Sequence, residues 1–257
     1  MKTIKLLGVI LVLLAGFAAA ALFPLLPRAA RLGITQAWSR ALLAVLGVRL
    51  DLEGEIEPRP ALLVANHVSW LDVLAISAVR PSVFVCKSEI AAWPALGWLL
   101  GRADTIFLRR RSAVAAGQAV QCATRQLRAG LSVALFPEGT STDGDAVLPF
   151  SAALFQAAVD AGCPVQPLAL SYSSRAAVYA GDTGFAESLL AVVSARGLCV
   201  SLSALPVLAA VADRRDAALR CRNLISARLT AGTFPAASRH ALAASLAAAQ
   251  GSRHSLV

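Results

Sequence analysis

Two short polar segments carry the side chains of this sequence whose types and spacing could do acid–base chemistry. The first reads NHVSWLD over 66–72 and places Asp72 five residues after His67. Histidine, with an unperturbed pKa of about 6.5, suits proton transfer near neutral pH. A nearby carboxylate can fix the tautomer of the imidazole and stabilise the imidazolium that forms. Taken alone, such a pair is more often structural than catalytic, so its meaning depends on the rest of the chain.

The second segment reads FPEGTST over 136–142 and follows the apolar run LSVAL. A Glu-Gly-Thr-Ser turn at the end of a strand offers backbone N–H groups and hydroxyls to an oxyanion or a phosphate. Gly139 permits a close backbone approach or a positive φ, although an ordinary tight turn would need the same residue. Together the two segments indicate acid–base chemistry next to an anionic group.

The elements that must position these segments alternate along the chain after Pro60, which predicts an α/β fold with a largely buried sheet. Strands are expected at 61–65, 82–86, 104–108, 131–136, 164–170 and 198–204. Helices are expected at 32–50, 70–79, 89–101, 112–129, 150–161, 184–195 and 213–231. We divide the chain into an N-terminal anchor at 1–27, an amphipathic helix and connector at 28–60, a catalytic domain at 61–232 and an Ala-rich tail at 233–257. Alanine favours a helix in this tail, and disorder is the alternative.

The composition is apolar and basic at once. Hydrophobic residues make up 57% of the chain and charged residues 15%, yet the net charge is +9. This combination favours an anionic membrane surface as a partner. Nucleic acid also attracts basic proteins, but aromatic residues are only 6% and no basic run alternates with them, so we expect no nucleic-acid partner. The five cysteines lie far apart without zinc-site spacing, which predicts small buried thiols and no metal site.

The N-terminal segment from Leu6 to Pro27 contains no charged residue. A bilayer crossing needs about 20 apolar residues, so a membrane helix is expected here. A cleaved signal peptide would also fit, with Lys2 and Lys5 as its basic start and alanines at its cleavage site. The arginines between 28 and 49 outnumber these lysines, which favours an uncleaved anchor with a cytoplasmic body. A re-entrant or interfacial helix is the remaining alternative.

The motifs, in their order, resemble those of the lysophosphatidic acid acyltransferases in the glycerophospholipid acyltransferase family. The segment at 66–72 resembles the first family motif, and the segment at 136–141 resembles the third. KSE at 87–89 with IFLRR at 106–110 is similar to the second, and PVQP at 164–167 to the fourth. The resemblance implies a glycerolipid acyltransferase-like sheet flanked by helices, joined here to an N-terminal membrane-anchoring helix.

The resemblance also implies roles for single residues. His67 would be the general base that deprotonates a hydroxyl, and Asp72 would orient it. Substrate binding is expected of Lys87, Arg110, Glu138, Gly139 and Thr140. The structural alternatives are a surface ion pair for Arg110, a solvated Lys87 and a capping role for Thr140. Glu138 could instead order Arg110 or its own turn.

The implied reaction moves a fatty acyl group from acyl-CoA or acyl carrier protein to the free hydroxyl of a lysophospholipid, with no cofactor or metal. The expected acceptor is 1-acylglycerol-3-phosphate, which would give phosphatidate at the cytoplasmic side of the inner membrane. The stretch 141–155 also resembles the branch of the family that acylates lyso-ornithine lipid. A hydrolase in which water replaces the acceptor and a non-catalytic membrane lipid-binding protein are the alternatives from other classes.

Overall fold

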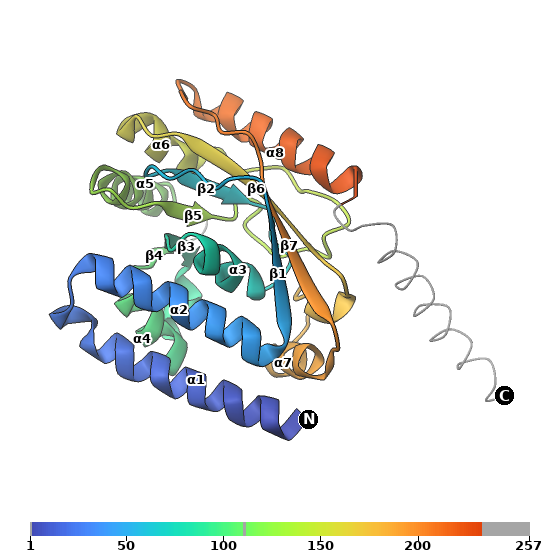
Figure 1. Ribbon diagram of the computed structural model, residues 1–257. Coiled ribbons are helices and arrows are strands. Elements are labelled where there is room, and N and C mark those ends of the chain that lie inside the picture. The colour runs from blue at the N-terminus through green and yellow to red at the C-terminus, as the bar shows by residue number, and fades with distance from the viewer. Residues whose placement is uncertain (1, 110–111, 233–257) are drawn as a thin grey trace.

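The computed structural model describes residues 2–109 and 112–232, which form a seven-stranded sheet in the order β1-β7-β6-β2-β5-β3-β4 (Figure 1). Neighbouring strands are parallel except for the antiparallel pair β6 and β7. The strands are β1 (Val48–Glu53), β2 (Leu62–Ala65), β3 (Val83–Lys87), β4 (Ile106–Leu108), β5 (Val133–Leu135), β6 (Val165–Tyr172) and β7 (Leu198–Ala204).

Helices cover both faces of the sheet, with α1 to α4 and α7 on one side and α5, α6 and α8 on the other (Figure 1). The α-helices are α1 (Lys2–Leu22), α2 (Arg28–Leu46), α3 (Leu71–Val79), α4 (Pro94–Arg102), α5 (Ala113–Arg128), α6 (Gln156–Ala161), α7 (Phe185–Ser194) and α8 (Arg214–Thr230). Short 3-10 turns are η1 (Phe23–Leu25), η2 (Ser88–Ala92), η3 (Ala153–Phe155) and η4 (Arg175–Ala177). The predicted α/β sheet flanked by helices is therefore confirmed.

Strand β2 lies at the centre of the core, and all four of its residues are buried. Successive side chains of a strand point to opposite faces. Leu63 accordingly packs into the core under α2, α3 and α7, whereas Leu62 and Val64 pack into the core under α5, α6 and α8. Burying one such side chain fully contributes about 1.5–3 kcal/mol, so this short strand is firmly held just before the first polar segment.

Helices α1 and α2 lie side by side as a hairpin (Figure 1). Trp38 Nε1 donates a hydrogen bond to the carbonyl of Val12 over 2.8 Å, and a Cβ at Gly16 would lie 2.3 Å from the same nitrogen. Lys5 Nζ donates to the carbonyl of Leu46 over 3.0 Å, at the negative end of α2. Specific contacts, and not only apolar character, therefore fix α1 on α2.

The segment Lys2–Leu25 has a mean hydropathy of 2.8 and is long enough to cross a membrane. Large side chains remain exposed on the side of α1 away from α2, including Leu7, Leu11 and Leu14. The helix thus has one face built for packing on α2 and an outer face that is apolar and unburied in the described residues.

The helix expected at 32–50 was predicted four residues too late, because α2 begins at Arg28. It ends at Leu46, where Gly47 takes a left-handed conformation with φ of 74°, and β1 follows at once. Strand β1 pairs in parallel with β7, from Val48 opposite Leu198 onward. Its sequence VRLDLE alternates apolar and polar residues, which is the signature of a half-buried strand. The helix expected at 89–101 is similarly divided before Pro94 into η2 and α4, because proline lacks the N–H that would continue a helix.

Candidate active site

The two polar segments meet at the carboxyl edge of the sheet. They follow β2 and β5, which are adjacent and parallel. The chain after β2 enters α3 on one face of the sheet, whereas the chain after β5 leads to α6 on the other face. In open α/β sheets, ligands usually bind at the carboxyl ends of strands whose following connections diverge in this way.

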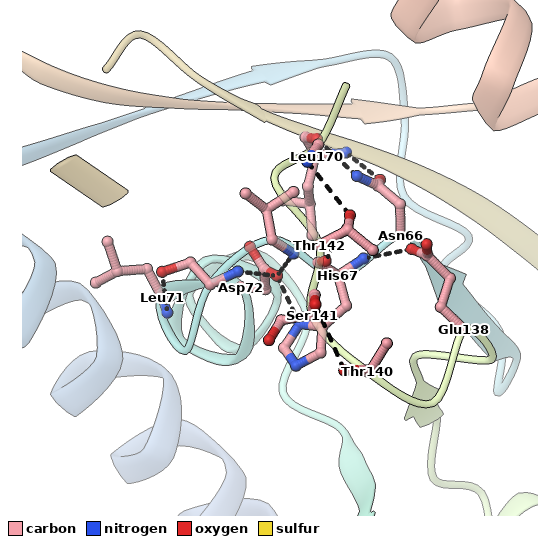
Figure 2. A network of polar contacts seen from close by, with 12 residues as sticks. Asn66, His67, Leu71, Asp72, Glu138, Thr140, Ser141, Thr142 and Leu170 are labelled. Atoms are coloured by element: carbon pink, nitrogen blue, oxygen red, sulfur yellow. Dashed lines mark hydrogen bonds and ion pairs between the residues drawn. The ribbon is translucent and has the colours of Figure 1, made fainter. Parts of the chain in front are cut away.

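His67 and Asp72 are in direct contact, with 2.8 Å between His67 Nδ1 and Asp72 Oδ2 (Figure 2). His67 lies in the turn between β2 and α3, and Asp72 lies in the first turn of α3. The Asp72 side chain is 0% exposed, and the same Oδ2 accepts hydrogen bonds from the backbone N–H groups of Val68 and Ser69. A buried carboxylate requires such partners, which hold it in one orientation.

Further contacts hold both the ring and the backbone of His67. Its ring stacks on Phe136, with 4.1 Å between ring centroids, and the backbone carbonyl of His67 accepts a hydrogen bond from Thr142 N over 2.8 Å. The Asp72 contact favours the tautomer with its proton on Nδ1, which leaves the lone pair on Nε2. The side chain is 23% exposed. This arrangement can accept a proton from a hydroxyl at Nε2.

Tyr172 is a further partner of Asp72, and sequence reasoning missed it. It is the last residue of β6, and its hydroxyl donates to Asp72 Oδ1 over 2.5 Å. The two residues are separated by 100 positions, and no motif links them. Only the pairing of β6 with β2, which sets Leu168 opposite Ala65, brings Tyr172 to this edge of the sheet.

Asn66 ties the same two strands together. Its side-chain amide donates to the carbonyl of Leu170 over 2.9 Å, and its side-chain oxygen accepts from the N–H of Leu170 over 2.8 Å (Figure 2). The residue is buried, so these two bonds satisfy polar atoms that water does not reach. They fix the chain one residue before His67.

Glu138 connects the two polar segments through the backbone. Its Oε1 accepts from the N–H of His67 and its Oε2 from the N–H of Leu148, each over 2.9 Å. Burial raises the pKa of Glu138 above its ordinary value, against the opposing effect of these two hydrogen bonds. The contacts match the expectation that Glu138 orders its own turn, and its role in binding substrate stays a prediction.

Gly139 and Thr140 form the turn that follows Glu138. Gly139 has a φ of 71°, and its N–H donates to the carbonyl of Phe136 over 3.0 Å. Thr140 is exposed, and residues 141–150 form no helix that it could cap. A positive φ is costly for residues other than glycine, so the turn itself accounts for Gly139. Substrate binding by either residue stays a prediction.

Two expected binding residues are placed less fully. Lys87 ends β3, opposite Leu108 of β4, and is half-buried near the same edge of the sheet. Arg110 lies outside the described residues, as does the Ala-rich tail at 233–257. The contribution of these side chains to binding stays a prediction.

The described residues contain no group of three or more His, Cys, Asp or Glu side chains that could hold a metal ion. All five cysteines are free. Burial raises the pKa of Cys86 to about 11 and that of Cys221 to about 12, so both thiols stay protonated near neutral pH. The polar chemistry of the described site therefore rests on the histidine, the carboxylates and the tyrosine.

Comparisons with known proteins converge on one family. Residues 49–171 match the family model named Acyltransferase. The chain is 40% identical over 139 residues to a lyso-ornithine lipid O-acyltransferase of Pseudomonas aeruginosa. It is 38% identical over 168 residues to a 1-acyl-sn-glycerol-3-phosphate acyltransferase of Neisseria meningitidis. These matches cover 54% and 63% of this chain, but only 54% and 66% of the two relatives. The chain thus spans between about half and two thirds of their length.

The fold also matches a solved structure. The crystal structure of the 1-acyl-sn-glycerophosphate acyltransferase of Thermotoga maritima superposes with a TM-score of 0.62 at 20% sequence identity. The superposition covers 91% of this chain and 100% of the other. At that identity the likeness shows the shared fold, including the sheet and its helical layers.

Proposed function

We propose that the protein transfers a fatty acyl group from an acyl thioester to the free hydroxyl of a lysophospholipid. The match of residues 49–171 to the Acyltransferase family model supports this reaction. The observation that carries the proposal is the 2.8 Å contact between His67 Nδ1 and the buried Asp72, at the edge of the sheet where ligands bind. Binding alone would need no base held in this way, which disfavours a non-catalytic lipid-binding protein.

In the proposed mechanism, His67 acts as the general base and Asp72 orients it. Nε2 takes the proton of the acceptor hydroxyl while the oxygen of that hydroxyl attacks the thioester carbonyl carbon. The tetrahedral oxyanion then collapses, the carbon–sulfur bond breaks, and the imidazolium returns the proton to the leaving thiolate. Positioned base catalysis typically contributes about 10²–10⁴-fold, so holding both substrates and stabilising the oxyanion must supply the rest.

The expected acceptor is 1-acylglycerol-3-phosphate. Lys87 and Arg110 would pair with its phosphate, since both cations bind that group. Gly139 and Thr140 would supply backbone and hydroxyl donors, and Glu138 would bind acceptor hydroxyl or hold the turn. The donor is acyl-CoA or acyl carrier protein, and the reaction as written uses no cofactor or metal.

Lyso-ornithine lipid is the second candidate acceptor. The observation in its favour is the 40% identity to a relative that bears that name. The two acceptors share a free hydroxyl on a single-chain lipid and differ in the headgroup charge. The choice between them leaves the chemistry at His67 unchanged.

The proposed location is the cytoplasmic side of the inner membrane. The apolar outer face of α1 would contact lipid, and the net charge of +9 would favour an anionic surface. In this scheme residues 1–27 anchor the protein, 28–60 connect the anchor to the body and 61–232 form the acyltransferase domain, with the tail at 233–257. The connector also supplies α2 and the edge strand β1 to the body.

The test is an assay of purified, detergent-solubilised protein with lysophosphatidate and lyso-ornithine lipid in parallel, each with CoA and carrier-protein donors. His67→Ala should abolish transfer, with a loss of at least about 100-fold in kcat, because the base is removed. His254→Ala, outside the described residues, is the matched control and should retain transfer.

Each outcome separates the classes of function. Wild-type turnover by His67→Ala would show that the catalytic assignment is wrong. Release of free fatty acid at the same rate with and without acceptor would indicate a hydrolase. Lipid binding without any acyl product would indicate the non-catalytic alternative.

A further inference from the structure

The Asp72 carboxylate has two oxygens with different surroundings. Oδ2 accepts three hydrogen bonds, from His67 Nδ1 and from the N–H groups of Val68 and Ser69. Oδ1 accepts the hydroxyl of Tyr172 over 2.5 Å. The three Oδ2 donors come from the turn between β2 and α3, whereas Tyr172 comes from the end of β6, the strand that pairs with β2.

The position of Tyr172 requires a hydroxyl and not only an aromatic ring. Asp72 is 0% exposed, so water does not replace a lost partner at Oδ1 without a rearrangement. Removing the donor while leaving a buried charged acceptor costs more than the bond itself contributes. A hydrogen bond to a carboxylate also draws negative charge toward the donor, away from the second oxygen that faces the imidazole.

We propose that Tyr172 is a positioning residue for the base: its hydroxyl fixes the Asp72 carboxylate and, through it, sets the basicity of His67. This inference rests on the proposed function, because it concerns the same histidine. Without the tyrosine hydroxyl, the carboxylate would hold more of its charge on Oδ2 and stabilise the imidazolium more strongly. His67 would then stay protonated to a higher pH, and less of it would be free to act as a base.

The surroundings of the hydroxyl agree with a permanent donor. Burial, followed by the negative charge of Asp72, raises the pKa of Tyr172 well above its ordinary range. The phenol therefore remains protonated near neutral pH. The Ser69 side chain also hydrogen-bonds to Tyr172 and partly opposes that shift. Glu138 is a further titratable side chain whose charge interacts with His67 and Asp72.

Tyr172→Phe tests the inference, because it removes the hydroxyl and keeps the ring. The chain has only two tyrosines, and Tyr179→Phe is a matched control because it also removes one hydroxyl and keeps the ring. Tyr179 contacts the site through its backbone N–H, which donates to the carbonyl of Val68 over 2.9 Å, and that bond survives the substitution. Both variants are assayed for kcat and KM of each substrate across the pH range, with thermal unfolding as a check of the fold.

In Tyr172→Phe we expect kcat near neutral pH to fall about 10-fold, the scale of one hydrogen bond to a charged group, with the KM of each substrate within about twofold. The acid limb of the kcat/KM profile, which reports the free base, should move to higher pH. Tyr179→Phe should leave both unchanged. An acid limb at the wild-type position in Tyr172→Phe overturns the inference, whether or not kcat falls, because a merely structural role would not move it.

A second measurement avoids any loss of folding. In the Tyr179→Phe background, biosynthetic replacement of the remaining tyrosine by 3-fluorotyrosine labels position 172 alone. Fluorine makes the phenol a stronger acid and a stronger hydrogen-bond donor, so the acid limb should move to lower pH. The two changes at Tyr172 thus predict shifts of opposite sign. Shifts of the same sign, or none, overturn the proposal.

Failure of this inference is distinguishable from failure of the proposed function. If His67→Ala abolishes transfer and the acid limb of the kcat/KM profile does not shift with either change at Tyr172, only the role of Tyr172 is wrong. If His67→Ala retains full turnover, the catalytic assignment itself is wrong, and the pH profile no longer reports on this histidine.

Discussion

The site depends most on the carboxylate of Asp72. It accepts hydrogen bonds from the turn before α3 and from the end of β6, and it is fully buried. His67 is thereby held through its side chain, while Thr142 and Glu138 hold its backbone carbonyl and N–H. A loop histidine without these contacts would sample many orientations, so the aspartate and its donors convert it into a preorganised base.

Asp72→Asn should lower kcat by at least about 100-fold, within the range that positioned base catalysis contributes. The asparagine side chain has only one acceptor oxygen. Its NH₂ group would face one or more of the N–H and O–H groups that donate to the carboxylate in the wild type. The unmet partners should also lower the free energy of unfolding by about 1–3 kcal/mol. The measurements are steady-state kinetics and urea unfolding. Asp182→Asn, at an exposed turn position, is the matched control, and equal effects of the two variants would contradict the assignment.

Glu138 gives a pH-dependent prediction for stability. Burial raises the folded-state pKa of this carboxyl above its ordinary value of 4.5. Its contribution to stability is therefore full below about 4.5 and declines as pH rises through the raised pKa, because the unfolded chain ionises more easily. The glutamine side chain of Glu138→Gln does not titrate. The free energy of unfolding of this variant should therefore rise relative to wild type as pH rises, by less than about 1 kcal/mol because the group is half-exposed. Urea unfolding at several pH values measures the difference, and a difference that is constant with pH would contradict the prediction.

At the scale of elements, the close packing of α1 on α2 depends on a glycine. Gly16 faces Trp38, and an added Cβ would lie 2.3 Å from Trp38 Nε1. Gly16→Ala should therefore displace the indole, break its bond to the carbonyl of Val12 and lower stability by about 1–3 kcal/mol. Gly33→Ala, on α2, meets nothing within 4 Å and should be neutral or stabilising by up to about 1 kcal/mol. Thermal unfolding in detergent compares the two variants, and equal melting temperatures would exclude the specific α1–α2 contact.

The elements also show what sequence patterns can and cannot predict. The strand expected at 198–204 coincides with β7, the predicted fold class is confirmed, and residues 49–171 match the Acyltransferase family model. Strand β1 was missed because the helical spacing before it was extended through Gly47, although its alternation was visible. Hydrogen bonds of Glu138 to two backbone N–H groups leave no pattern in the sequence, since their partners are main-chain atoms. Tyr172 was missed for a different reason: its place beside Asp72 depends on strand register, which a motif search does not contain.

At the scale of the whole molecule, most of the exposed large apolar side chains of the described residues lie on or beside α1, α4 and α7. Helix α1 covers the layer of α2 and α3, and Trp98 of α4 stacks on its Phe17 with 5.8 Å between ring centroids. Trp98 is itself exposed. The layer of α5, α6 and α8 lies on the opposite face of the sheet (Figure 1). The proposed lysophospholipid acceptor is a membrane component, so an apolar side of the molecule would bring His67 to the surface that contains this acceptor.

The outer face of α1 gives the last prediction. Leu7, Leu11 and Leu14 are 58%, 59% and 60% exposed, and burying half of each in lipid would contribute about 1 kcal/mol per side chain. Replacing all three by serine should therefore weaken partitioning into phosphatidylglycerol-containing vesicles by at least about 10-fold, as measured by co-sedimentation. Val114→Ser, at a residue that is 73% exposed on α5, should leave partitioning unchanged. The triple variant keeps the face of α1 that contacts α2, so equal partitioning of wild type and variant would show that this helix face does not hold the protein to the membrane.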